Sequence, residues 1–546
     1  MKEISQADGI EDFADNDYIY VDKTEYIYKL VKKYKRVFFS RPRRFGKTLT
    51  LNIIGTLYEE GVEPYFKGTW IYDKWTFGQF PVLRLNFQNY RAQSVSEFKE
   101  LCSKAIIGFA NEQELNGLVT STEPDVAVLE LLNALKHKKQ RIVILIDEYD
   151  YQMTANINNR ELYEEFRLCI RNFYSNLKSN KQIKFMAVTG VTRLKDVSIF
   201  SAGSDIKDLT YESAFSQMIG FTREEIKRFY RDYLKLGVCY EQNKQIKPED
   251  VTEKQVEEFL DRMAYHYDGY CFDELCKDKV FSTWSVNNFL QALSNNHEVI
   301  FGDYWYDVGG VPSILANYLE KHTLDVAVLQ QEEILISYND FKNPTSLTSI
   351  NQSVLMCQTG YLTLRSSLAP GRFNIRLGIA NRETESALSA LLSLKIFDKT
   401  QDLLDQNDQN ILEYCDASQL ISILNEQLAS VVYDKYPIKD ESTLRSVLQL
   451  YLQGSRVDVR AESHNAHGSA DLILNFKRRR IVLELKFSQD GRNAQSLLNQ
   501  ALKQIDENDY GRESLGGREL LRIAAVFSAA KDERKITLWQ EVAETK

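Results

Sequence analysis

The chain has 546 residues, of which 43% are hydrophobic and 27% charged, as is ordinary for a globular protein. A chain of this length can form about three or four domains, each with a core that needs no disulfide or structural metal. No apolar run approaches the length of a membrane helix, and the acidic N-terminus does not resemble a signal peptide, so we expect a cytoplasmic protein without membrane contact. The seven cysteines form no CxxC pair, which disfavours a zinc ribbon or a disulfide framework. The net charge of −9 neither indicates nor excludes nucleic-acid binding, because such binding depends on local basic patches.

The first functional signal is a basic segment near the N-terminus, residues 29–47, with nine Lys or Arg residues and no acidic one. Within it, the apolar run 37–40 predicts a strand, and apolar side chains at helical spacing follow the loop. A strand, a tight loop and a helix that opens with Gly-Lys-Thr form a phosphate-binding geometry, because N–H groups at the helix start face an anion. Lys47 would contact the phosphates, and the Thr48 hydroxyl would bind Mg²⁺. The alternative is a solvated basic helix followed by a loop, which is the usual meaning of a charge run. In addition, Arg41 stands where the full phosphate-loop pattern has its first glycine.

The second half of the predicted nucleotide site lies further along the chain. The run 142–146 predicts a strand buried on both faces, and it ends in Asp147 and Glu148. An aspartate at this place can hold Mg²⁺ bound to a nucleotide, and the adjacent glutamate can act in catalysis by polarising the attacking water. A further strand at 183–188 ends at Thr189, which could contact the γ-phosphate. We therefore predict that ATP and Mg²⁺ bind here.

Strands alternate with helical segments throughout this part of the chain. Another apolar strand is predicted at 81–87, and helices are predicted at 96–110, 125–136 and 159–177. This alternation favours a parallel sheet with helices on both faces. The predicted fold class is therefore α/β, with a P-loop ATPase module in residues 1–220.

Six segments carry a family resemblance: YVDKT (20–24), SRPRRFGKT (40–48), LIDEYD (145–150), TGVT (189–192), FS (200–201) and YDGY (267–270). They resemble the AAA-ATPase-like family of bacterial proteins, in which an RPRRFGK[ST] loop stands in place of the glycine-first loop. The resemblance covers roughly residues 1–310, although the family's Asn-Pro reads Ser282-Thr283 here. It implies that the cofactor-binding loop consists of Arg43, Arg44, Phe45, Gly46, Lys47 and Thr48.

Residues 221–410 are predicted to form a mostly helical middle region. An aromatic cluster at 304–310 has two interpretations: base stacking on nucleic acid, or packing of a helical subdomain against the ATPase core, which we favour. The polar stretch 398–410 has no apolar periodicity, which predicts a linker.

A hairpin near the C-terminus carries polar residues inside an apolar strand. Residues 471–476 and 481–487 predict two strands joined by a basic turn at 477–480. Glu484 and Lys486 lie two apart in the return strand, so their side chains share one face. Polar groups on a core face are costly unless they pair or hold a metal, so these two residues indicate a site.

Two further carboxylates complete this constellation: Asp471 begins the partner strand, and Glu441 begins a helical segment that can pack on the sheet. A Glu, Asp, Glu-x-Lys set is that of the PD-(D/E)XK nuclease superfamily, whose carboxylates hold Mg²⁺ and whose lysine serves the attacking water. We expect Asp471 and Glu484 to be the metal ligands. Glu441, Lys486 and Gln504, on the following helix, complete the predicted catalytic set. The alternative is an ordinary hairpin with a salt bridge.

The C-terminal part also has matching segments at 468–472 (GSADL), 483–486 (LELK) and 501–505 (ALKQI). They resemble the nuclease-superfamily domain that commonly ends AAA-ATPase-like proteins, except that Ser469 stands where that family usually has arginine. His464 and His467 could suggest zinc, but we interpret them as solvated. The predicted domain is an α/β restriction-endonuclease-like domain in residues 411–546.

Together these patterns predict a protein that binds or hydrolyses ATP, and whose nucleotide state controls a Mg²⁺-dependent nuclease. Its expected partner is nucleic acid, DNA rather than RNA, and a homo-oligomer is compatible with the sequence. The resemblance also suggests a role in defence or in mobile elements. The main alternative is a nucleotide-dependent regulatory or scaffolding switch, whose nuclease fold binds nucleic acid or a partner without cutting.

Overall fold

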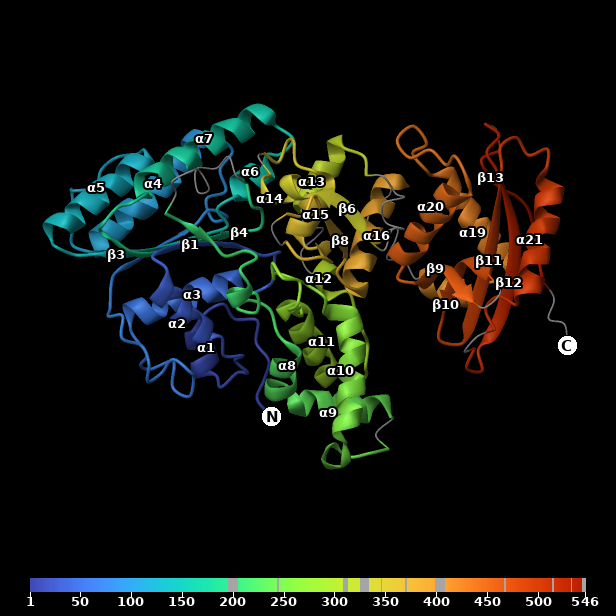
Figure 1. Cartoon of the computed structure of the whole chain (residues 1–546), viewed down its shortest axis with the longest axis horizontal. Coiled ribbons are helices and arrows are strands. Elements are labelled where there is room, and N and C mark those ends of the chain that lie inside the picture. The colour runs from blue at the N-terminus through green and yellow to red at the C-terminus, as the bar shows by residue number, and fades with distance from the viewer. Residues whose placement is uncertain are drawn as a thin grey trace. The chain divides into compact units, whose positions relative to one another are not determined.

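The computed structural model describes residues 1–194, 205–242, 245–307, 313–324, 333–344, 346–368, 371–397, 408–465, 468–512, 515–531 and 533–542. The chain divides into two compact units, of which the first contains Met1–Lys321 and Glu333–Thr384 (Figure 1). The second contains His322–Glu332 and Glu385–Lys546. The predicted nucleotide site lies in the first unit and the predicted nuclease site in the second. Most of the predicted linker lies outside the described residues, and the division into three domains stays a prediction.

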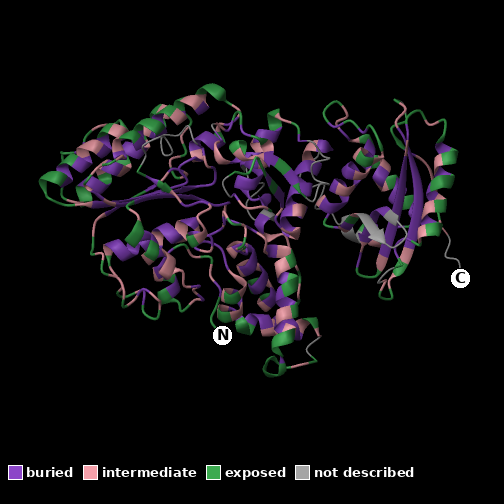
Figure 2. Ribbon diagram, viewed as in Figure 1, coloured by how far each residue is buried: buried purple, intermediate pink, exposed green. Residues whose placement is uncertain are grey.

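The first unit is built on a parallel five-stranded sheet with the strand order β2-β3-β4-β1-β5. The strands are β1 Arg36–Ser40, β2 Val82–Asn86, β3 Ile142–Asp147, β4 Ile183–Gly190 and β5 Lys207–Asp208. β1, β3 and β4 are buried along almost their whole length, as their apolar runs predict (Figure 2). Because parallel strands end at the same edge, the residues that follow β1, β3 and β4 meet there.

Helices cover both faces of this sheet (Figure 1). One face carries α1 Ile10–Asp15, α2 Thr24–Lys33 and α3 Lys47–Glu59, and the other carries α4 Val95–Glu112, α5 Pro124–His137 and α7 Arg160–Leu177. The short α6 Tyr151–Ala155 precedes α7. Side-chain caps fix the starts of two helices, since Ser94 accepts from Glu97 N–H and Asn159 from Leu162 N–H. The predicted strands and helices of this module are confirmed.

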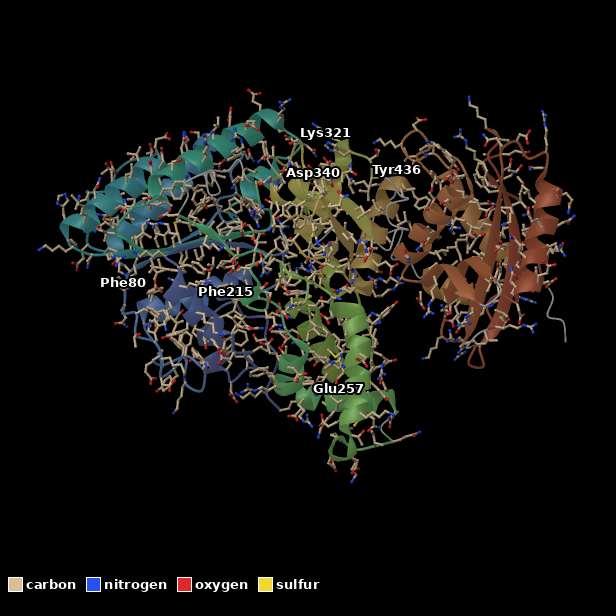
Figure 3. The ribbon with its side chains drawn as sticks, viewed as in Figure 1. Phe80, Phe215, Glu257, Lys321, Asp340 and Tyr436 are labelled. Carbon is tan, nitrogen blue, oxygen red and sulfur yellow. The ribbon has the colours of Figure 1, made fainter. Side chains whose placement is uncertain are left out.

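The middle of the chain continues the first unit and is mostly helical, as predicted. Its helices are α8 Arg223–Phe229, α9 Arg231–Glu241, α10 Glu253–Tyr267, α11 Thr283–Asn296, α12 Tyr304–Asp307 and α13 Ser313–Lys321. α8 to α11 share one hydrophobic core, and Glu257 on α10 forms ion pairs with Arg223 and Lys227 on α8 (Figure 3). Gly269, after α10, has φ +102°, and a Cβ there would lie 2.2 Å from the Ala380 carbonyl oxygen. Only glycine allows this close approach.

The middle also contains a small antiparallel sheet that the sequence did not predict. Its order is β6-β8-β7, with β6 Ile334–Ser337, β7 Leu362–Leu364 and β8 Asn374–Ile379. α14 Tyr338–Lys342 and α15 Gln352–Thr359 lie between these strands in sequence. Such short strands leave little periodicity to detect.

The second unit contains a five-stranded sheet with the order β13-β12-β11-β10-β9, parallel only between β11 and β12. The strands are β9 Asp458–Asn465, β10 Gly468–Asn475, β11 Arg479–Ser488, β12 Glu519–Ser528 and β13 Lys535–Glu541. α19 Ala417–Ala429 and α20 Glu441–Gly454 lie on one side of it and α21 Ala494–Asn508 on the other (Figure 1). The remaining helices are α16 Arg382–Ile396, within which the boundary between the units falls, and α18 Asp408–Tyr414.

Candidate functional site

The loop between β1 and α3 ends at Gly46, the N-cap residue of α3. Gly46 has φ +96°, a left-handed conformation that glycine adopts readily, and it offers no side chain to cap the helix. An anion can therefore approach the N–H groups of the first turn. This is the strand, loop and helix geometry that the sequence predicted.

A nucleotide site of this kind requires the start of α3 and the end of β3 to meet, and they do. The Thr48 hydroxyl donates to Asp147 Oδ2 at 2.6 Å, and Lys47 Nζ lies 3.3 Å from Glu148 Oε1. Lys47 Nζ also donates to the Pro42 carbonyl oxygen at 3.3 Å. Burial, and then the charge of Glu148, raises the pKa of Asp147 to about 6. The four predicted side chains thus form one connected group.

Thr189, at the end of the neighbouring strand β4, is fully buried. Its hydroxyl has no hydrogen-bond partner among the described residues. A buried hydroxyl without a partner is costly, so a ligand or a water is expected to satisfy it. Asp150, which the sequence analysis did not select, accepts from the Thr192 N–H at 2.6 Å and hydroxyl at 2.5 Å. It thereby ties the segment after β3 to the segment after β4.

Arg41, in the place of the first glycine, points into the protein core and not toward the anion site. Its side chain is 1% exposed and donates to the carbonyl oxygens of Ser40 and Thr210 at 2.8 Å and of Phe215 at 3.4 Å. The guanidinium carbon lies 4.1 Å from the centre of the Phe272 ring, and burial lowers the pKa of Arg41 to about 10. The arginine therefore anchors the loop.

The next loop residues are also held by the middle region. The Phe45 ring is 1% exposed and packs edge-on against Tyr270 at 4.7 Å between centroids. Its side chain therefore cannot contact a phosphate, which limits its predicted role in cofactor binding to its backbone. Arg44 donates to the Trp305 carbonyl oxygen at 3.0 Å, and its guanidinium lies 4.7 Å from the Trp284 ring centre. Trp305 Nε1 in turn donates to the Arg43 carbonyl oxygen at 3.3 Å.

A cavity of about 310 Å³ opens beside this loop. Lys47, Thr48 and Glu148 contribute to its wall, and apolar residues from elsewhere in the first unit complete it, among them Ile19 and Phe221. A cavity that combines a phosphate-binding loop with an apolar wall suits a nucleoside phosphate. The YVDKT segment supports the wall, because Lys23 Nζ bonds the Gln217 carbonyl oxygen at 2.8 Å and Glu225 at 2.6 Å.

The predicted C-terminal constellation comes together around Lys486. Lys486 Nζ lies 3.0 Å from Glu484 Oε1 on the same strand and 3.3 Å from Glu441 Oε1 at the start of α20. Asp471 on β10 accepts from the Leu485 N–H at 2.8 Å. All but Glu441 are nearly inaccessible to solvent. This is an interior group of charges, so a surface salt bridge is not the explanation.

The charges in this group perturb one another strongly. Burial, and then the charge of Asp471, raises the pKa of Glu484 to about 7. Burial alone would lower the pKa of Lys486, but the charge and hydrogen bond of Glu484, with the charges of Glu441 and Asp471, together raise it. Burial also raises the pKa of Glu441. Such shifts are typical of functional sites.

Comparison with known proteins agrees with this geometry. Residues 8–200 match the family model described as predicted AAA-ATPase, and residues 439–537 match that of the PD-(D/E)XK nuclease superfamily. The chain therefore contains an AAA-ATPase-like domain and a PD-(D/E)XK nuclease-superfamily domain. Both resemblances predicted from the sequence are confirmed.

A curated protein is similar over nearly the full length of the chain. The curated protein named "Uncharacterized protein in vnfD 5′ region", from Azotobacter chroococcum mcd 1, is 26% identical over 542 residues, which are 97% of each chain. The solved structure of Cdc6p from Pyrobaculum aerophilum is 13% identical, with a TM-score of 0.21 over 66% of this chain and 88% of its own. That of Orc1 from Aeropyrum pernix in complex with DNA is 10% identical, with a TM-score of 0.25 over 70% and 98%.

Two buried side-chain oxygens in the nuclease-superfamily domain lack a hydrogen-bond partner among the described residues. Glu484 Oε2 and Gln504 Oε1 have no hydrogen-bond partner within the part of the chain that the structure describes. Unsatisfied buried carboxylate and amide oxygens are the ligands that Mg²⁺ prefers, so the residues fit this ion. In the described ranges, however, no three His, Cys, Asp or Glu side chains are already placed to hold a metal. Lys486 and a second cation pair with the carboxylates instead.

That second cation is Arg445, which the sequence analysis missed. It lies on α20, four residues after Glu441, and Arg445 Nη1 is 2.9 Å from Asp471 Oδ1. Its spacing from Glu441 was the signal that could have found it, because residues four apart share a helix face.

The predicted basic turn of the nuclease-superfamily domain needs a correction. Arg479 donates to the Cys415 carbonyl oxygen at 2.5 Å, and Arg480 donates to Asn475 Oδ1 and the Gly511 carbonyl oxygen, both at 2.8 Å. Both arginines belong to β11, so only Lys477 and Arg478 remain exposed in the turn. The predicted turn at 477–480 is therefore two residues too long, because β11 already begins at Arg479.

Three other expectations concern the rest of the chain. Trp305, in the predicted aromatic cluster, is 3% exposed and packs near the phosphate loop, which fits the packing interpretation. The side chain of His464 and all of His467 lie outside the described residues, so the zinc question stays a prediction. Among the described helices, none is both long and apolar enough to cross a membrane.

Proposed function

We propose that the AAA-ATPase-like domain binds ATP with Mg²⁺ in the cavity beside α3 and hydrolyses it. The observation that carries this proposal is the connected group of Lys47, Thr48, Asp147 and Glu148 at one edge of the sheet. Lys47 would bind the terminal phosphates, and the α3 N–H groups would bind their oxygens. Thr48 and Asp147 would hold the ion, which supplies charge neutralisation to the phosphates when it is bound.

Glu148 would orient the attacking water and accept its proton. In the structure this carboxylate is held by Lys47, so it becomes available when phosphates draw Lys47 away. Thr189 would donate its unsatisfied hydroxyl to the γ-phosphate. These roles give one task to each of the five predicted side chains of the site.

We further propose that the nuclease-superfamily domain cleaves nucleic acid, with DNA the first expected substrate. Asp471 and Glu484 would hold Mg²⁺, which lowers the pKa of a bound water when it is present. Lys486, between Glu484 and Glu441, would orient that water and stabilise the charge that develops on the phosphate. Gln504 would complete the ligand shell with its buried amide oxygen.

A chain of contacts supports control of the nuclease by the nucleotide. Trp305 contacts the phosphate loop through Arg43 and Arg44, and its backbone N–H donates to Glu383 Oε1 at 2.8 Å. Glu383 is fully buried and lies in α16, the helix within which the sequence passes to the second unit. A change in the loop on nucleotide binding would therefore reach the start of α16.

The test is cleavage of single- and double-stranded DNA and RNA by the full chain in Mg²⁺ or Mn²⁺, with and without ATP. Trp305→Phe keeps an aromatic ring but removes the N–H that bonds Arg43. We expect this variant to bind ATP and to cleave, but with a smaller effect of ATP on the cleavage rate. An unchanged ATP effect would contradict this route.

One observation favours a second function, the regulatory or scaffolding switch. The carboxylates of the nuclease-superfamily domain face Lys486 and Arg445, so the site as described is not yet a metal site. A wild-type protein that binds DNA but does not cleave it in Mn²⁺ would establish the switch in place of the nuclease.

A further inference from the structure

Arg445 holds one of the carboxylate oxygens on which the predicted metal site depends. The Arg445 and Asp471 side chains are 12% and 8% exposed, so their ion pair is largely shielded from solvent. The other oxygen of Asp471 accepts the Leu485 N–H. Both oxygens of Asp471 are therefore occupied, and a divalent ion must compete with the guanidinium for Oδ1.

The formal charge of the site changes sign when a divalent ion binds. Glu441, Asp471 and Glu484 oppose Lys486 and Arg445, which leaves one formal negative charge when all are ionised. A bound divalent ion would leave one net positive charge, with two cations still beside it. An interior group of this kind needs an anion, and a phosphate diester supplies a single negative charge.

We propose that Arg445 is a substrate-binding residue that occupies Asp471 until the metal arrives, and then binds a phosphate of the nucleic acid. The inference rests on the nuclease function proposed above. Arg445 lies one helical turn after Glu441, so its Cα is close to the site. Its side chain has several rotatable bonds, which allow the guanidinium to move from Asp471 to a phosphate. A guanidinium binds phosphate through two parallel hydrogen bonds, as it binds carboxylate, so the exchange keeps its bonding pattern.

The proposal predicts opposite effects of one substitution on two measurements. In Arg445→Gln the competitor for Asp471 is absent, so Mn²⁺ should bind the nucleotide-free full chain more tightly, by about tenfold or more in calorimetry. The same variant should bind DNA more weakly in Ca²⁺ and cleave it about a hundredfold more slowly in Mn²⁺. A merely structural ion pair would not raise metal affinity, because its loss would loosen the site.

Controls separate the sources of each signal. Asp471→Asn shows which part of the calorimetric heat of Mn²⁺ binding comes from this site. Arg512→Gln is the matched control, because it removes an exposed arginine that pairs with Asp509 in the same unit. Arg445→Lys retains the charge but not the paired donors, so it should keep the wild-type metal affinity and lose most of the cleavage. Cooperative thermal unfolding shows that each variant is folded.

The possible outcomes decide the question. Suppose that Mn²⁺ binding depends on Asp471 and that Arg445→Gln binds Mn²⁺ no more tightly than the wild type does. That result overturns the role of Arg445, while the nuclease proposal stands. Binding seen only in Arg445→Gln supports the role, since the arginine then excludes the ion. Absence of Asp471-dependent binding in both proteins overturns the nuclease proposal together with this inference.

Discussion

Lys47 and Glu148 form an ion pair at the meeting point of α3 and β3, with Lys47 Nζ 3.3 Å from Glu148 Oε1. Both side chains are almost fully buried, so each charge depends on the other. A nucleotide phosphate would replace Glu148 as the partner of Lys47. The pair thus links phosphate binding to the release of the predicted catalytic carboxylate.

Replacing Lys47 by alanine should weaken ATP binding by about 10- to 100-fold, the value of one hydrogen bond to a charged group. A nucleotide titration of the folded variant measures this. The matched control is Lys29→Ala, which removes a lysine of the same basic segment that instead pairs with Glu25 on the exposed side of α2. Equal ATP affinity in the Lys47 variant and the control would remove Lys47 from the site.

Replacing Glu148 by glutamine should leave ATP bound but slow its hydrolysis by about 10²- to 10⁴-fold, because the amide cannot accept the proton of the water. Phosphate release at saturating ATP, together with an ATP titration, separates the two effects. Wild-type turnover in this variant would assign the base to another residue. Asp150 is the next carboxylate to test, since it is buried nearby and its pKa is raised by burial and then by the charge of Glu148.

Replacing Lys486 by alanine should remove nearly all cleavage and leave DNA binding largely intact. Asp471→Ala should remove metal binding as well, and the double variant should be no worse than either single one, because the residues act as a unit. DNA binding in Ca²⁺ and cleavage in Mn²⁺ are the two measurements. Cleavage that persists in the double variant would point to another site.

DNA affinity should depend on Lys477 and Arg478 and not on Arg479 or Arg480, whose side chains bond within the domain. Replacing both exposed residues by alanine should reduce the salt dependence of log Kd by up to about 2, one for each lost phosphate contact. The affinity is measured at several salt concentrations. A salt dependence equal to that of the wild type would place the DNA on a different surface.

The raised pKa of Glu484 predicts two pH dependences. A carboxyl whose pKa rises from 4.5 unfolded to about 7 folded stabilises the fold below the unfolded value, and this contribution is lost as pH rises through about 7. Metal affinity should change in the opposite sense, because the ion competes with the proton and binds more tightly from pH ~6 to pH ~8. Thermal unfolding and Mn²⁺ titrations test both. Glu484→Gln should flatten both profiles, and a profile that survives it must come from another group.

Sequence patterns predicted the parts of the fold whose signals are local and long. The run 142–146 and the spacing of Glu484 and Lys486 specify a buried strand and a shared face, and both are found. Short elements such as β5, with two residues, carry no periodicity. The register between distant elements was also out of reach, so the sequence could place Arg445 on the helix face of Glu441 but could not show that it pairs with Asp471.

The hydrogen-bond partner of a charged side chain is equally hard to predict from the sequence. Arg41, Arg479 and Arg480 belong to basic runs that look like anion sites, yet backbone carbonyl oxygens and a side-chain amide oxygen accept their hydrogen bonds. Whether an arginine meets a phosphate or a carbonyl depends on which loop ends come near it. That information lies in the tertiary structure and not in the run itself.

The anchoring of the phosphate loop by Arg41 and Phe45 also has a thermodynamic consequence. Their partners include Phe272 and Tyr270, so the conformational entropy of the loop is already lost when the middle region folds, and little remains to be lost when a nucleotide binds. Local unfolding of the segment around these aromatic residues would release the loop, and ATP binding would then have to order it again at a cost in free energy. As the denaturant concentration rises, ATP affinity should therefore be lost before the parallel sheet unfolds.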